Sequence, residues 1–91
     1  MKIADILPEK EIQEAVLGEY EKRLILYKLT DEQLKKKYKM DFKDFEEKNI
    51  VKKKGFSWDV EQDAMHWEHA VEGMKYIEKK IKKIKAINAK N

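Results

Sequence analysis

Residues 56–74 read FSWDVEQDAMHWEHAVEGM, and the spacing of their apolar side chains sets the fold expected for the chain. Apolar residues recur here at steps of three and four, the period of one face of an α-helix. The stripe continues toward the C-terminus and comprises Val60, Ala64, Trp67, Val71, Met74, Ile77, Ile81, Ile84 and Ile87. Its mean step of about 3.4 residues favours a left-handed supercoil, since an undistorted helix repeats every 3.6. The pattern predicts one long helix over residues 58–87.

A second apolar stripe occupies the first third of the chain. Pro8 suits the first turn of a helix, where its missing N–H has no partner to lose. The stripe then consists of Ile12, Val16, Tyr20, Leu24 and Tyr27, and Leu17 and Ile25 broaden it. These positions predict a long helix over residues 9–29.

Capping signals divide the segment between the two stripes. Thr30, with Gln33 three residues later, has the pattern of a capping box, and Asp41 is a second N-cap candidate. We expect two short helices within residues 31–49, followed by a solvated link at residues 52–55. The fold class predicted for residues 1–91 is therefore a single all-α domain. Its two long helices form an antiparallel hairpin with coiled-coil-like packing and with the two short helices between them.

Composition limits the function classes. The chain has 91 residues and no cysteine, which excludes disulfides and cysteine-ligated zinc. No apolar run approaches the roughly 18 residues of a membrane-spanning helix, and the N-terminus lacks the pattern of a secretory signal. We therefore expect a cytoplasmic protein without a membrane partner.

The charged residues are strongly zoned. Residues 56–74 hold five acids and none of the 21 Lys and Arg, whereas residues 35–55 and 75–91 carry net charges of +5 and +6. The Lys-rich zones at 35–54 and 75–91 suggest nucleic-acid binding as one hypothesis. Its candidate contacts are Lys35, Lys36, Lys37, Lys52, Lys53 and Lys54. Arg23 is the one arginine, although arginine is the better ligand for phosphate and guanine.

Two histidines in the same stretch raise the question of a metal or an active site. His66 and His69 are three residues apart on the predicted helix, so a shared metal ion needs a third ligand from another element. Candidate acid and base groups all lie on this one helix, whereas catalytic groups converge from several elements. We expect no metal, no cofactor and no enzymatic activity.

The two tryptophans predict a surface for a protein partner. Trp58 and Trp67 lie about half a turn apart on a regular helix, so they do not face the same neighbour. One packs inside the hairpin, and the other is free to anchor a partner. The predicted partner-binding region comprises Trp58, Asp59, Asp63, His66 and Trp67. A hairpin also leaves apolar side chains uncovered, which predicts a homo-oligomer.

Two quoted segments carry a family resemblance over residues 27–81. YKLTDEQLKKKYKMDFKDFEEK and SWDVEQDAMHWEHAVEGMKYIEKKI resemble small helical proteins of archaea and bacteria thought to be antitoxins of type II toxin–antitoxin pairs. The similarity involves Tyr38, Met40, Phe42, Phe45, Asp63, Trp67 and Glu68, whereas Lys39 replaces the family's usual turn glycine. The resemblance implies that the chain binds and neutralises a small, basic ribonuclease toxin, in some cases with repression of its own operon.

Overall fold

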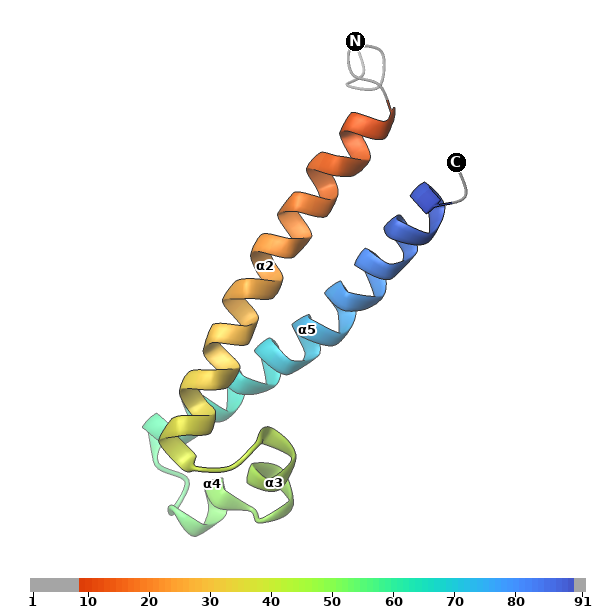
Figure 1. Ribbon diagram of the computed structural model, residues 1–91. Helices are drawn as coiled ribbons and strands as arrows, with labels where there is room; N and C mark the ends of the chain where they lie inside the picture. The colour runs from red at the N-terminus through yellow and green to blue at the C-terminus, as the bar shows by residue number, and fades with distance from the viewer. Residues whose placement is uncertain (1–8, 90–91) are drawn as a thin grey trace.

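The computed structural model describes residues 9–89, which form an all-α hairpin (Figure 1). Its helices are α2 (Glu9–Tyr38), α3 (Phe42–Glu47), α4 (Ile50–Lys53) and α5 (Trp58–Ala89). The long helices α2 and α5 run antiparallel and pack against each other, and α3 and α4 form a cap at the closed end. The predicted fold class is confirmed, while the predicted role of Pro8 lies outside the described residues.

The core is concentrated where the cap meets the two long helices. One buried side chain from α2, one from α3 and two from α5 form it, namely Leu34, Phe45, Val60 and Trp67. Beyond this cluster, Ala70, Ile77 and Ile81 are buried along the arm of the hairpin. The molecule measures 56 × 28 × 16 Å, so it is a slender hairpin with one thick end. None of the helices within residues 9–89 has both the length and the apolar character needed to cross a membrane.

The predicted boundary at Thr30 is wrong, because α2 continues without a break from Glu9 to Tyr38. Thr30 does not act as a cap; its Oγ1 donates a hydrogen bond of 3.3 Å to the carbonyl of Leu26 inside the same helix. Because α2 continues past Thr30, the side chains of Tyr27, Leu34 and Tyr38 all lie on one face toward α5. The stability gained from this packing exceeds the roughly 1 kcal/mol that an N-cap at Thr30 would contribute. The segment 31–38 is thus the last two turns of the first long helix.

The cap begins as predicted and then departs from the prediction. Asp41 accepts a hydrogen bond of 2.9 Å from the backbone N–H of Asp44, which starts α3. α3 ends at Glu47, and α4 includes Lys52 and Lys53, the first two residues of the expected solvated link. The joints use left-handed backbone at Lys39 (φ 57°) and at Asn49 (φ 52°), a conformation favoured by Gly and Asn. Lys39 adopts the left-handed conformation because the residues before and after it in the chain pack into the aromatic core, which fixes the direction of the backbone.

The hairpin seam follows the two predicted stripes, with exceptions at Val16, which is 41% exposed, and at two isoleucines. Ile25 is 61% exposed and lies on the side of α2 turned away from α5, so it does not broaden the seam. Ile87 is 51% exposed, where α2 and α5 move apart toward their free ends (Figure 1). The helices pack closely at Gly73, where an added Cβ would lie 2.5 Å from Cε2 of Tyr27. The Tyr27 ring therefore packs directly on the backbone of α5.

We predict opposite effects for alanine at the two helical glycines. Gly18→Ala adds a methyl group in open space, so it should raise the free energy of unfolding by about 0.5–1 kcal/mol. Gly73→Ala gains the same helix propensity but displaces the Tyr27 ring, and overpacking costs about 1–3 kcal/mol. Its free energy of unfolding should fall by about 1 kcal/mol. Urea denaturation followed by circular dichroism measures both, and an equal gain from both variants would contradict the close packing.

Candidate functional site

The two tryptophans of the stretch 56–74 have opposite environments. Trp67 is fully buried, with 0% of its surface exposed, whereas Trp58 is 68% exposed at the first residue of α5. The half-turn separation expected from the sequence accounts for this difference, because α5 has one face on α2 and the cap and another toward solvent. Trp67 is therefore the internal tryptophan, and Trp58 is the tryptophan accessible to a partner.

Trp67 is held by aromatic rings and by one hydrogen bond. Its ring stacks on Tyr38 at a centroid distance of 5.9 Å and lies 5.4 Å and 5.0 Å from the rings of Phe42 and Phe45. Its indole Nε1–H donates to Oδ1 of Asp31 at 2.8 Å. The hydrogen bond satisfies a buried donor that would otherwise destabilise the fold. Asp31 also forms an ion pair of 3.2 Å with Lys35.

Asp63 is the polar junction between α5 and the end of α2. Lys37 Nζ and the Tyr38 hydroxyl both donate to its Oδ2. Burial alone raises the pKa of Asp63, but these two hydrogen bonds and the charge of Lys37 outweigh it and lower the pKa below its usual range. The pKa of Tyr38 is raised by burial, by its hydrogen bond to Asp63 and by the charges of Asp63 and Asp59. Asp63 is thus engaged in holding the hairpin together.

An outer face of α5 lies opposite Trp67 and carries exposed aromatic and apolar side chains. At about 100° per residue, Trp58, Met65 and Tyr76 lie within about 20° of one another and about half a turn from Trp67. Trp58 and Met65 are 68% and 67% exposed. Three glutamates with exposed or partly exposed side chains lie along one side of them: Glu61, Glu68 and Glu72. Met65 was not among the residues predicted from the sequence, although its seven-residue spacing from Trp58 indicates a shared face.

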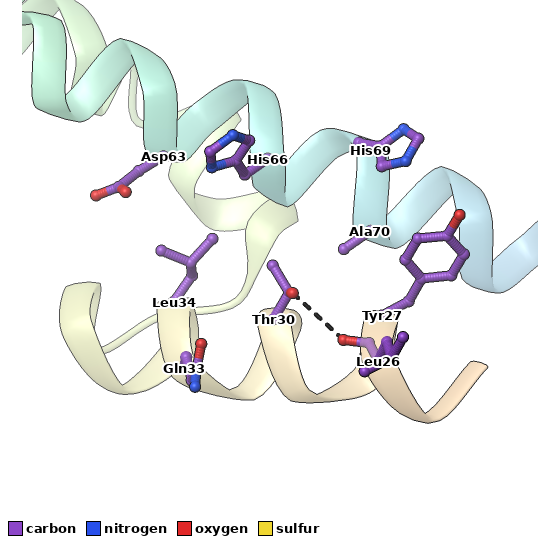
Figure 2. A pocket seen from close by; sticks show the side chains of 9 residues that line it. All are labelled: Leu26, Tyr27, Thr30, Gln33, Leu34, Asp63, His66, His69 and Ala70. Atoms are coloured by element: carbon purple, nitrogen blue, oxygen red, sulfur yellow. Dashed lines mark hydrogen bonds between the residues drawn. The ribbon is translucent and has the colours of Figure 1, made fainter. Parts of the chain in front are cut away.

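The histidines lie over a groove of about 400 Å³ between α2 and α5 (Figure 2). His69 packs edge-on against Tyr27 at a centroid distance of 5.4 Å, whereas Asp63 points toward the opposite end of the groove. Leu26, Thr30 and other α2 residues form the other wall. Among the described residues, no three His, Cys, Asp or Glu side chains group closely enough to hold a metal ion. The groove is thus a shallow, mixed surface along two helices.

The five residues predicted to face a partner do not form one surface. Asp63 and Trp67 require correction, because the former pairs with α2 and the latter is fully buried. Asp59 and His66 are exposed, but Asp59 acts electrostatically on Tyr38 and His66 lines the groove, so both lie toward α2. Trp58 alone lies on the outer face. The reason is the helical period, which places Trp58 and Trp67 about half a turn apart and the other three residues at angles between them.

The lysines considered for nucleic acid fall into two groups. Lys35 and Lys37, in the last turn of α2, form ion pairs with Asp31 and Asp63. Lys36 lies between them and is exposed. The second group is exposed at the end of α4 and just after it, and comprises Lys52, Lys53 and Lys54. The second group therefore offers more charge to a phosphate than the first.

We predict that the effect of a substitution at Asp31 depends on whether the new side chain can still accept the hydrogen bond from the Trp67 indole N–H. Asp31→Ala leaves the buried N–H without a partner and should lower the free energy of unfolding by about 1–3 kcal/mol more than Asp31→Asn. Asparagine keeps an oxygen acceptor at the same place, and both variants lose the ion pair to Lys35, so their difference isolates the hydrogen bond. Equal stabilities in chemical denaturation at one protein concentration would contradict this role.

The hydrogen bonds at Asp63 predict that the free energy of unfolding falls at low pH and again at high pH. Because folding lowers the pKa of Asp63, its contribution is present above the unfolded value of about 3.9 and is lost as pH falls through the folded pKa. Because folding raises the pKa of Tyr38, its contribution is present below the unfolded value of about 10 and is lost as pH rises through the folded pKa.

Two variants measure these contributions separately. The stability difference between wild type and Asp63→Asn should shrink below about pH 4, and that between wild type and Tyr38→Phe should shrink above about pH 10. Denaturant titrations across pH provide both differences, which cancel the titration of all other groups. Differences that do not change with pH would contradict the junction.

Nothing matched this chain in comparisons with protein-family models, with curated proteins or with solved structures. The antitoxin resemblance of residues 27–81 therefore stays a prediction.

Proposed function

We propose that this protein is a non-enzymatic interaction module that binds a basic protein partner through the outer face of α5. The observation that carries the proposal is Trp58, an indole 68% exposed at the start of a stretch with five acids and no Lys or Arg. Burial of such a side chain stabilises a complex more than most contacts do. The resemblance to antitoxins suggests the partner's identity, a small basic ribonuclease toxin.

The acidic half of the outer face has the chemistry of a binding surface. Trp58 and Met65 provide an apolar centre two helical turns long, and Glu61, Glu68 and Glu72 line one side of it with negative charge. Negative charge attracts a basic partner and speeds encounter, while the apolar centre slows dissociation. When α5 binds across the basic catalytic cleft of such a toxin, it inhibits the toxin by blocking access to the cleft and by neutralising its charge.

The non-enzymatic part of the proposal is supported by the roles of the polar side chains. Asp63, whose pKa is lowered, is occupied by Lys37 and Tyr38 in the hairpin itself. His66 and His69 are exposed along one helix and do not converge with Asp63 on a common point (Figure 2). General acid–base catalysis requires groups within hydrogen-bond reach of one substrate atom.

Nucleic-acid binding is the second candidate, and Lys52, Lys53 and Lys54 favour it. All three are exposed next to α4. This function predicts that DNA or RNA binds with a steep dependence on salt, which is reduced when the three lysines are replaced by glutamine.

Co-expression with the product of the adjacent gene tests the first proposal. We expect the two proteins to co-purify, and Trp58→Ala to weaken the complex by about 30- to 100-fold in calorimetric titration. Tyr76→Ala is the matched control, because Tyr76 is 57% exposed on the same outer face but lies in the basic half of α5. Its affinity should stay within about threefold of wild type. Failure of the two proteins to associate, or equal losses in both variants, would contradict the proposal, and salt-sensitive nucleic-acid binding would favour the second candidate.

A further inference from the structure

A second apolar patch lies on the back of α2, on the side turned away from α5. Ile25 and Leu29 are 61% and 50% exposed there, and Leu26, which is 57% exposed, borders them at the edge of the groove between α2 and α5. They occupy neighbouring positions on little more than one turn of helix, so their side chains form a contiguous apolar surface. Isolated exposed apolar residues are common, but three together mark a surface that another protein covers.

The residues on this back face have a symmetric order. Lys22, Ile25, Leu29 and Glu32 follow one another at steps of three, four and three, which places all four on one helical stripe. Reading the stripe in the opposite direction exchanges Ile25 with Leu29 and Lys22 with Glu32. An antiparallel copy of the same helix therefore places apolar on apolar and each charge on its opposite. Interfaces with a twofold axis require this kind of self-complementarity.

The wider charge pattern of α2 favours the same direction. Exchange of Ile25 with Leu29 centres the pair on residue 27, so residues 16–23 of one α2 face residues 31–38 of the other. Glu19 then comes level with Lys35 of the other copy, and Arg23 comes level with Asp31, so opposite charges meet.

The exposed surface of the hairpin leaves room for such an interface. Its accessible surface is 7329 Å² at a mass of 10.9 kDa. A compact monomer of that mass exposes roughly 5,600 Å². A stable dimer of standard size buries about 800 Å² on each copy. This area is smaller than the excess of the hairpin's accessible surface over that of a compact monomer.

We propose that α2 docks antiparallel on α2 of a second copy of this chain, with Ile25 against the partner's Leu29 and Lys22 against the partner's Glu32. The twofold axis passes near residue 27 of both helices. Each α5 then lies on the far side of its own hairpin, so both outer faces stay free. The dimer is thus independent of the partner proposed for α5, and either proposal can fail alone.

Sedimentation velocity from micromolar to millimolar concentration tests the dimer on the full chain. We expect the wild type to form a dimer, and Leu29→Glu to raise its dissociation constant by at least about tenfold, since a twofold axis applies each substitution twice. Met65→Glu is the matched control, because it places the same charge at an equally exposed position on α5, and the dimer should persist. Circular dichroism should show unchanged helicity in both variants.

Charge reversal tests the register. Lys22→Glu and Glu32→Lys should each weaken the dimer by several-fold, whereas the double variant should return it to within about twofold of wild type. The two residues are about 15 Å apart on one helix, so a rescue reports contact between copies. A monomer at every concentration, a dimer that Met65→Glu dissociates while Leu29→Glu does not, or a double variant weaker than both single variants would overturn the proposal.

Discussion

The hydrogen bond from the Trp67 indole to Asp31 is the constraint on which the remaining arrangement depends. It joins the two long helices through the fully buried Trp67, and its geometry fixes the rotation of α5 about its own axis. The rings of Tyr38, Phe42 and Phe45 enclose the indole from the end of α2 and from α3, so the cap is seated on the same side chain. Once Trp67 faces inward, the helical period places Trp58 and Met65 outward.

The polar contacts near Trp67 make this packing specific for one register. Asp63 lies one turn before Trp67 on α5 and accepts from both Lys37 and Tyr38, while Tyr38 also stacks on the indole. A shift of α5 by one turn would separate Asp63 from both donors and Trp67 from Asp31. Farther along the arm the seam is apolar and narrow, with Ala70, Ile77 and Ile81 as its buried residues. Alignment of the two helices is therefore determined at the capped end.

Much of this architecture follows from local patterns in the sequence. The stripe of α5, the Asp41 cap and the half-turn between the tryptophans each depend on positions close together in the chain, and all three hold in the structure. Thr30 was misread because its capping-box pattern is local, whereas the reason to continue α2 is packing against a helix almost 40 residues away. The partners of Asp63 were not predictable for the same reason, since Lys37 and Tyr38 reach it only through the path of the cap. Ile25 was misplaced for a local reason, because the sequence of a broad apolar stripe does not reveal which edge of the stripe faces the other helix.

The placement of the two tryptophans also gives the chain a pair of natural optical probes. An indole emits at shorter wavelength in an apolar interior than in water, and Trp67 and Trp58 occupy these two environments. Trp67 reports on whether the hairpin and its cap are assembled, because three aromatic rings surround it. Trp58 reports on what covers the outer face of α5 and is accessible to a dissolved quencher. Folding and occupancy of this surface are thus readable as separate spectral signals from the unlabelled protein.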